Sequence, residues 1–212
     1  MLSGTVELDD FYVGARSDGP GRGCGKQAVI AAVERGTAAS GPGRLCLRAV
    51  PDCGSGAYAA FAEGHVGVLS RVIADGWAGT RAGLAGWPGL EQAPFDASDP
   101  DAALPTCHHV ISNFKAFVQG TYHGVSRTRF QGFCDEFAWR YSHRGRGGAA
   151  ALLRDCCSGH PSRDELLRGM MEEQPYGPPF TAASKEGREH AERVKSLVAA
   201  AQAVAREAKT AA

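Results

Sequence analysis

The stretch Thr5-Val-Glu-Leu-Asp-Asp-Phe-Tyr-Val13 is the starting point for interpreting the fold. It is rich in β-forming residues and alternates in part between apolar and polar side chains, which predicts a strand. An acidic pair, Asp9 and Asp10, stands in its middle. Acids inside an apolar strand are costly to bury as charges unless they are paired or bind a metal ion. The stretch therefore predicts one strand of a sheet and also a candidate site.

The elements after this strand predict the topology of the sheet. Glycine-rich turns separate it from strands predicted at residues 27–34 and 44–50, so the three strands form an antiparallel meander. Alanine content and spacing predict a short helix over 55–66, followed by a buried strand over 68–74. A strand reached through a helix lies parallel to an earlier one by the right-handed crossover rule. This order predicts an α/β fold, specifically a ribonuclease H-like mixed sheet with flanking helices.

The second half of the chain is predicted to be mainly helical. Residues 87–104 are expected to be mostly irregular, with a short strand near 92–95. From 107 to 144, apolar residues recur at helical spacing, which predicts two helices split at 120–124. An apolar stripe in the tail predicts an amphipathic helix that packs on this domain or on a partner. We expect one domain over 1–150, a linker with a short helix over 151–182, and a C-terminal amphipathic helix over 183–212.

Composition narrows the class of protein. With 212 residues, of which 43% are hydrophobic, the chain can bury one sizeable core but not two. No stretch approaches the roughly 18 apolar residues of a membrane span, and the N-terminus has no signal-peptide pattern. The seven cysteines form no CxxC pair, and we expect free thiols. We expect a cytoplasmic protein without a membrane partner.

Charge is unevenly distributed along a chain whose formal net charge is zero. Residues 107–150 hold six Lys and Arg against two Asp and Glu, together with four of the seven histidines. An anionic partner would meet the protein at this basic block. The alternative is that the block is an ordinary solvated face.

Asp75 is the second candidate acid, at the end of the fourth predicted strand and 66 residues after Asp9. In the predicted sheet the two strands are neighbours, which brings both carboxylates to one edge. Such carboxylates form the oxygen site that magnesium or manganese prefers, and two such ions can activate the attacking oxygen and stabilise the leaving one in phosphodiester chemistry. The alternative is that Asp75-Gly76 is an ordinary turn and Asp9-Asp10 an edge-strand charge pair.

Five sequence blocks carry a family resemblance. Val6-Glu-Leu-Asp-Asp-Phe-Tyr-Val-Gly14 resembles V-E-V-D-E-T-Y-I-G-G, and Val72-Ile-Ala-Asp-Gly-Trp77 resembles a block with T-D-G-W. The other three blocks, His109 to Lys115, Gly120 to Ser126 and Asp135 to Arg140, resemble H-x-V-x-S-N-L-K, G-T-x-H-G-V-S and D-E-F-x-F-R. These patterns, in this order, are typical of insertion-sequence transposases of the DDE class, in the ISXO-two-like, Merlin-related family. The resemblance spans residues 4 to about 146.

The resemblance implies a catalytic domain that cuts and joins DNA with Mg²⁺ or Mn²⁺ in a two-metal site. Asp9 and Asp75 would be the first two metal carboxylates. Glu136, Asn113 and His123 are the candidates for the third catalytic role, and Glu136 is the carboxylate among them. Glu136 stands 61 residues after Asp75, further than is usual in such enzymes. The alternative is a surface Glu136 paired with Arg140 at i, i+4.

The same resemblance implies that the partners are transposon ends and target DNA, with a homo-oligomer in the active state and a location at the bacterial nucleoid. Positively charged side chains supply most non-specific DNA affinity. The candidates for binding phosphates are all in the basic block: Lys115, Arg127, Arg129, Arg140 and Arg144.

Two departures from the family pattern favour an alternative function. Thr128-Arg129-Phe130-Gln131 stands where relatives commonly have Lys-His-Leu-Gln. Relatives also carry a zinc ribbon and a helical DNA-reading segment before the catalytic domain, which we expect this chain to lack. The alternative is a truncated, inactive remnant that at most binds DNA. An unrelated α/β enzyme would instead have a deep apolar pocket, and Gly21 to Lys26 lacks the residues of a phosphate loop.

Overall fold

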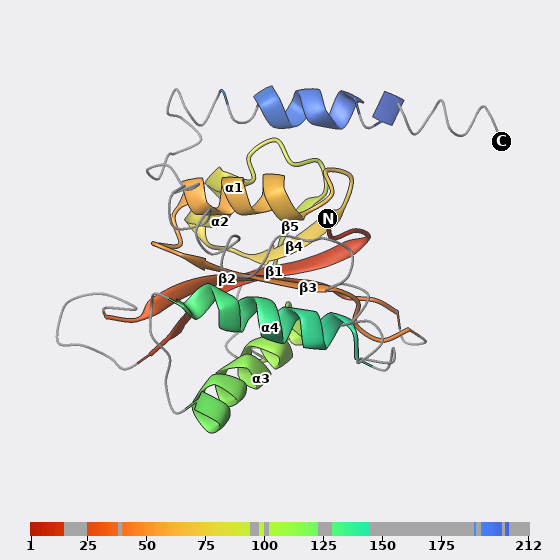
Figure 1. The fold of residues 1–212 in the computed structure, drawn as a ribbon. Helices are drawn as coiled ribbons and strands as arrows, with labels where there is room; N and C mark the ends of the chain where they lie inside the picture. The colour runs from red at the N-terminus through yellow and green to blue at the C-terminus, as the bar shows by residue number, and fades with distance from the viewer. Residues whose placement is uncertain are drawn as a thin grey trace, which may run out of the picture.

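A five-stranded mixed sheet with the strand order β3-β2-β1-β4-β5 forms the centre of the fold (Figure 1). The computed structural model describes residues 1–14, 25–37, 40–93, 98–99, 102–122, 129–144, 189, 192–200 and 202–203. The strands are β1 (Thr5–Val13), β2 (Gln27–Glu34), β3 (Leu45–Val50), β4 (Arg71–Asp75) and β5 (Leu90–Ala93). The helices are α1 (Ser55–His65), α2 (Ala78–Gly83), α3 (Pro105–Tyr122) and α4 (Phe130–Ser142).

Strand β1 occupies the middle of the sheet. It pairs antiparallel with β2 along its length, from Val6 opposite Glu34 to Val13 opposite Gln27. On its other side it pairs parallel with β4, which the chain reaches through α1. The predicted meander with a parallel fourth strand is therefore confirmed, and this arrangement is the ribonuclease H-like α/β fold.

Two layers of helices cover the two faces of the sheet. Helices α1 and α2 lie on one face, and α3 and α4 lie on the other (Figure 1). Because successive side chains of a strand point to opposite faces, β1 contributes to both cores. Val6 and Leu8 pack in the core that contains Phe61 of α1. Phe11 packs in the core that contains Phe114 of α3.

Helix α4 also covers the outer edge of β3. Gln131 accepts a hydrogen bond from the Ala49 N–H at 2.8 Å and donates one to the Leu47 carbonyl at 3.0 Å. Ser142 accepts one from the Leu45 N–H at 3.0 Å. An edge strand with unpaired backbone groups is a template for aggregation. The polar side chains of α4 therefore close an edge that would otherwise pair with another chain.

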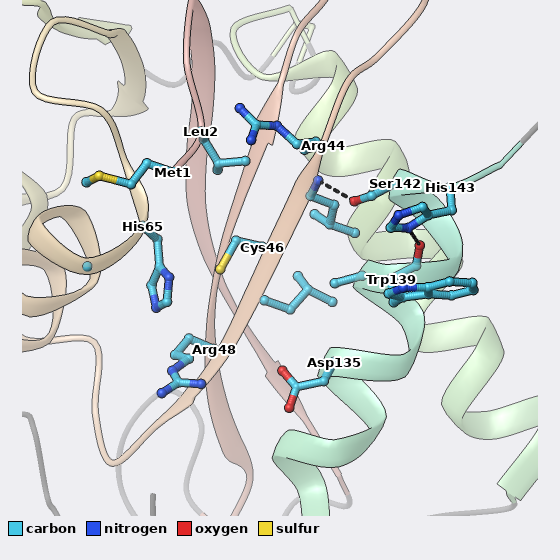
Figure 2. Close-up of a pocket in the computed structure, with 14 residues that line it drawn as sticks. Met1, Leu2, Arg44, Cys46, Arg48, His65, Asp135, Trp139, Ser142 and His143 are labelled. Carbon is cyan, nitrogen blue, oxygen red and sulfur yellow. Dashed lines mark hydrogen bonds between the residues drawn. The ribbon is translucent and has the colours of Figure 1, made fainter. Parts of the chain in front are cut away.

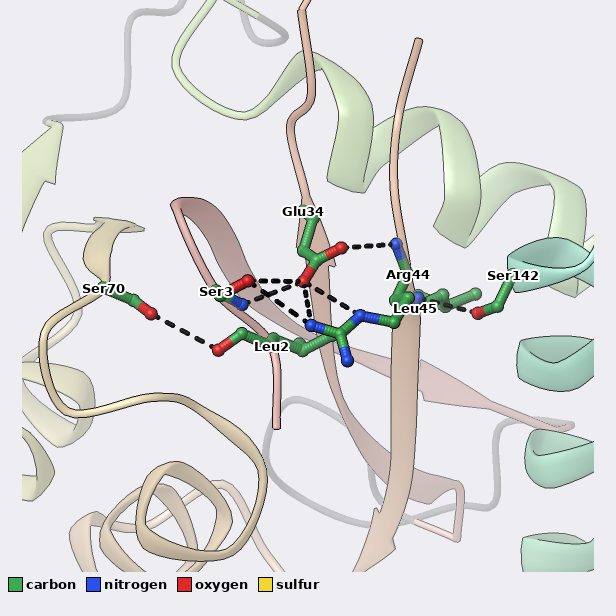
Figure 3. A network of polar contacts seen from close by, with 7 residues as sticks. All are labelled: Leu2, Ser3, Glu34, Arg44, Leu45, Ser70 and Ser142. Atoms are coloured by element: carbon green, nitrogen blue, oxygen red, sulfur yellow. Dashed lines mark hydrogen bonds and ion pairs between the residues drawn. The ribbon is translucent and has the colours of Figure 1, made fainter. Parts of the chain in front are cut away.

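The start of β1 is joined to β2 and β3 by a carboxylate network around Glu34 (Figure 3). The Glu34 carboxylate accepts hydrogen bonds from the backbone and side chain of both Ser3 and Arg44. Burial alone would raise the pKa of Glu34, but the hydrogen bonds from Arg44 and Ser3 and the charge of Arg44 lower this pKa to about 2. Glu34 is therefore ionised and has a structural role.

Several boundaries differ from the sequence prediction. Strand β4 begins at Arg71 and not at residue 68, because residues 67–70 form a turn in which the Ser70 N–H donates to the Gly67 carbonyl. Helix α2 was not predicted, since its six residues are too few for an apolar stripe. Strand β5 begins two residues before the predicted one, and the short helix predicted in the linker lies outside the described residues.

Part of the predicted C-terminal helix packs on this domain. Residues 192–200 are helical, and Val194 is fully buried in the core that contains α1. Arg193 forms an ion pair with Glu63 of α1 at 3.0 Å. The apolar stripe was predicted to pack either on this domain or on a partner, and Val194 of the stripe packs on this domain. Across the described segments, no helix is long and apolar enough to cross a membrane.

Candidate carboxylate site

Three acids of β1 have different surroundings. Glu7 and Asp9 point toward α3, where Glu7 accepts a hydrogen bond from the Cys107 N–H at 2.8 Å. Asp10 points to the opposite face, where it accepts a hydrogen bond from the Tyr58 hydroxyl at 2.7 Å. Glu7 is fully buried and Asp10 nearly so, whereas the Asp9 side chain keeps 15% of its surface exposed. Of the three, Asp9 is the one most open to solvent.

Asp9 and Asp75 each follow the last paired residue of two neighbouring strands. The parallel register between β1 and β4 ends with Leu8 opposite Ala74, and the two aspartates are the next residues along both strands. Neighbouring strands are about 4.8 Å apart, and residues at paired positions point to the same face. Ile73 packs in the core under α3, so Asp75, two residues later, is on the α3 face with Asp9. The topology thus brings together two acids that are 66 residues apart in the sequence.

Asp75 also shapes the turn that follows it. Its Oδ1 accepts a hydrogen bond from the Trp77 N–H at 3.1 Å, which is an Asx-turn contact. The Gln92 side chain of β5 donates to the Asp75 carbonyl at 3.4 Å. Asp75-Gly76 therefore does form a turn, as the alternative interpretation predicted. This turn uses only one oxygen of the Asp75 carboxylate, so it is compatible with a second role for Asp75.

Glu7 fixes the helix that faces these acids. Arg35 forms an ion pair with Glu7 Oε1 at 2.5 Å and donates a second hydrogen bond to the Ala103 carbonyl at 2.9 Å. Glu7 Oε2 accepts the Cys107 N–H in the first turn of α3, where backbone N–H groups lack partners within the helix. One buried carboxylate therefore anchors the start of α3 against β1, two residues before Asp9.

His108 is the residue of α3 that contacts the site. Its Nε2 lies 3.3 Å from Asp9 Oδ2. His108 is one of the four histidines of the basic block, and no catalytic role was predicted for it. The pattern H-x-V-x-S-N-L-K has its histidine four residues before the serine, and His108 stands four residues before Ser112, so this pattern is the signal that could have found it. A histidine in this position can orient the Asp9 carboxylate.

Asn113, a candidate for the third role, faces away from Asp9 and toward α4. Its side chain hydrogen-bonds to the His109 ring at 3.0 Å. Both residues line an open groove of about 510 Å³ between α3 and α4, together with Arg140 and Arg144. The structure therefore brings Asn113 together with two of the predicted phosphate-binding arginines.

Glu136, the second candidate, has partners within the helical layer. Arg140 forms an ion pair with it at 2.8 Å at i, i+4, and the Tyr122 hydroxyl donates to it at 3.2 Å. This is the surface pair considered as the alternative for Glu136. His123, the third candidate, lies outside the described residues. Within the described part of the chain, no group of three or more His, Cys, Asp and Glu residues is arranged to hold a metal ion.

The donor set of Asp9 and Asp75 nevertheless fits a magnesium-type ion. Mg²⁺ usually keeps several waters and is bound through one or two carboxylates plus substrate phosphates, so it does not require an all-protein cage. Two carboxylates on adjacent strands meet this requirement, and DNA would supply the phosphate oxygens.

The predicted DNA-binding residues are spread along α3 and α4. Lys115 lies on the Asp9 side, with its Nζ 5.6 Å from the centre of the Phe11 ring. Arg129 is exposed just before α4. Arg144 stacks on the Tyr141 ring at 3.9 Å and also donates to the Pro42 carbonyl. Arg127 lies outside the described residues.

A second groove, of about 400 Å³, lies at the β3 edge (Figure 2). Figure 2 shows Arg48 and His65 on one side of it and Asp135 and Trp139 of α4 on the other. Burial lowers the pKa of His65 to about 4, assisted by the charge of Arg48. Burial also raises the pKa of Cys46 to about 12, so this thiol stays protonated and is not a nucleophile. The strand order places β2 and β1 between this groove and Asp75.

The remaining described cysteines are also free thiols, as predicted. Burial raises the pKa of Cys53 to about 12 and raises those of Cys107 and Cys134 as well. Buried, protonated thiols are inert. The described cysteines are therefore not candidate nucleophiles.

Comparison with known proteins agrees with this fold. No curated protein matches the chain significantly. The family model for the ISXO2-like transposase domain matches residues 1–142, which include all five strands, α1 to α4 and both candidate aspartates. The chain therefore belongs to the ISXO2-like transposase family.

Proposed function

We propose that this transposase domain cuts a DNA phosphodiester at a transposon end and then joins the freed 3′ hydroxyl to target DNA. The observation that supports the proposal is the parallel register of β1 and β4, which ends at Leu8 opposite Ala74, so that Asp9 and Asp75 are the next residues of the two strands. Bound Mg²⁺ or Mn²⁺ would activate the attacking oxygen and stabilise the charge on the leaving one. We assign residues 1–150 to the catalytic domain, 151–182 to a linker and 183–212 to a C-terminal helix.

In this proposal the protein holds and orients the reacting groups. Asp9 and Asp75 present carboxylate oxygens on one face of the sheet, and His108 fixes the rotamer of Asp9. Glu7 keeps His108 in place through the start of α3. We propose that a third site residue comes from Asn113, His123 or Glu136.

The basic side chains would guide the DNA backbone to this pair. Lys115 is on the same helix as His108, and Arg140 and Arg144 line the groove beside Asn113. We assign Arg127 and Arg129 to the same role. The active form is proposed to be a homo-oligomer at the nucleoid, since two transposon ends must be cut and joined together.

A nicking assay on short duplexes with Mn²⁺ tests the proposal. Wild-type protein should nick DNA, and Asp75→Asn should remove the activity while leaving DNA binding intact. Glu91→Gln is the control because Glu91 belongs to an exposed ion pair with Arg71 on β4 and should not affect nicking. Equal nicking by wild type and Asp75→Asn would contradict the proposal.

The second candidate function is an inactive remnant that binds DNA. It is favoured by the absence of a three-residue metal group among the described residues and by Thr128-Arg129 in place of the usual Lys-His. DNA binding by the wild type, with no nicking in Mg²⁺ or Mn²⁺, would select this candidate.

A further inference from the structure

Trp77 is an exposed aromatic side chain beside the candidate site. It follows Asp75 by two residues and keeps 52% of its surface exposed. The other large apolar residues that are similarly exposed in the described segments are aliphatic or methionine: Met1, Leu69 and Leu197. An indole costs much more to expose than most side chains, so its position at the end of β4 requires an explanation.

The indole is held in one orientation. Its Nε1–H donates to the Cys53 carbonyl at 3.3 Å, which joins it to the loop before α1. Gly79 makes room for this contact, because a Cβ atom at residue 79 would lie 2.5 Å from Trp77 Nε1 and 3.0 Å from the Cys53 carbonyl oxygen. The polar edge of the ring is therefore fixed to the protein while much of its surface faces solvent.

The same turn connects the ring to the carboxylate pair and to a cation. The Trp77 backbone N–H donates to Asp75 Oδ1, so the turn that carries the indole also holds that carboxylate. Arg81 follows Trp77 by one helical turn, and its Nε–H donates to Gln92 at 2.8 Å. A guanidinium has five N–H donors, so Arg81 can also meet a phosphate. An aromatic face and a cation thus follow Asp75 at the end of β4, with the ring against the loop before α1 and the candidate carboxylates on the α3 face.

We propose that Trp77 is a stacking platform for an unpaired nucleobase next to the phosphate that is cut. This inference rests on the proposed function, since it identifies the DNA form that the site takes. Every base presents a π-face, so an aromatic side chain binds single-stranded DNA with little sequence preference. Bases inside a duplex are already stacked, so the platform selects DNA that is frayed, flipped or single-stranded at the cut.

Fluorescence titration tests the platform without cleavage. The probe is a short duplex with a single-stranded 3′ overhang that contains 2-aminopurine, whose fluorescence is quenched by stacking, and EDTA keeps the DNA intact. The full chain should quench the probe. Trp77→Ala should remove the quenching and weaken overhang binding by about tenfold or more, the effect of losing an aromatic stacking partner. Trp77→Phe should retain most of the quenching, and Leu69→Ala should behave as the wild type.

A pair of glycine substitutions tests the held orientation while leaving the indole present. Gly79→Ala should displace the ring and reduce the quenching. Gly64→Ala is the matched control, because a Cβ at this helical glycine meets nothing within 4 Å. Unchanged quenching in both Trp77→Ala and Gly79→Ala would overturn the inference.

This readout separates the platform from the proposed function. Quenching that depends on Trp77 would support the platform even if the wild type nicks no DNA with Mn²⁺. Conversely, Asp75-dependent nicking together with equal overhang binding by wild type and Trp77→Ala would overturn the platform alone.

Discussion

The sheet contains two carboxylate regions with different surroundings. At the start of β1, Glu34 accepts hydrogen bonds from both the backbone and the side chains of Ser3 and Arg44. Further along β1, Asp9 accepts a backbone N–H and meets a histidine ring, and Asp75 is the corresponding next residue of the neighbouring strand β4. A carboxylate surrounded by donors is neutralised by the protein itself. Two adjacent carboxylates repel each other and gain most from a shared cation.

The largest expected effect is a difference in nicking rate between variants of the two neighbouring aspartates of β1, Asp9 and Asp10. Asp9→Asn should reduce nicking by more than about 100-fold, beyond the 10- to 100-fold typical of outer-shell partners in metal sites. Asp10→Asn should leave nicking within about tenfold, because the amide oxygen still accepts the Tyr58 hydroxyl on the opposite face. Nicking rates under identical Mn²⁺ conditions measure both. Similar losses of nicking in the two variants would contradict the assignment of the site to the α3 face of β1.

A second prediction concerns folding stability and not activity. Glu7→Gln should lower the free energy of unfolding by about 2 kcal/mol, because it removes the buried charge that pairs with the partly exposed Arg35. Glu91→Gln, which breaks the exposed pair with Arg71, should cost less than about 0.5 kcal/mol. Urea unfolding of the two variants measures the difference. Equal effects would mean that Glu7 does not anchor α3.

A third prediction concerns the residue that links α3 to the pair. His108→Ala should lower nicking by about tenfold, the lower end of the outer-shell range, with little change in stability. His109→Ala is the neighbouring control, since His109 faces the groove with Asn113. A larger loss of nicking in His109→Ala than in His108→Ala would instead indicate that the third catalytic residue lies in that groove.

The smallest expected effect is the pH dependence of Glu34. Its folded pKa of about 2 is below the ordinary value of 4.5, so its contribution to stability is complete above pH 4.5 and is lost as the pH falls toward 2. Solvent screening limits this contribution to less than about 1 kcal/mol. Glu34→Gln should flatten this part of the stability profile. An unchanged acid slope in the variant would show that the network does not hold the proton off Glu34.

Local patterns were sufficient to predict the sheet. Residues 5–13 and 27–34 have alternating or continuous apolar runs bounded by glycine, and β1 and β2 match those bounds. Helix α2 was not predicted because its six residues are too few to show a helical repeat of apolar side chains. The predicted fourth strand began before β4 does because the turn at 67–70 is partly apolar.

The sequence could predict only the part of the candidate site that depends on the order and direction of the strands. The helical crossover predicts that β4 is parallel to β1, and the register between these two strands makes Asp9 and Asp75 their next residues. The contact between His108 and Asp9 depends instead on how α3 crosses β1, which Glu7 and Arg35 set through contacts distant in sequence. Helical spacing alone could not reveal that Asn113 faces the groove between α3 and α4.

Binding of Mn²⁺ followed by electron paramagnetic resonance tests the shared carboxylate site most directly. We expect wild-type protein to bind Mn²⁺, and we expect Asp9→Asn and Asp75→Asn each to weaken Mn²⁺ binding by more than about tenfold. We further expect the double variant to be hardly weaker than either single one, because residues that act on one ion are not additive. Mn²⁺ affinity that is the same in the wild type and both single variants would contradict a shared site.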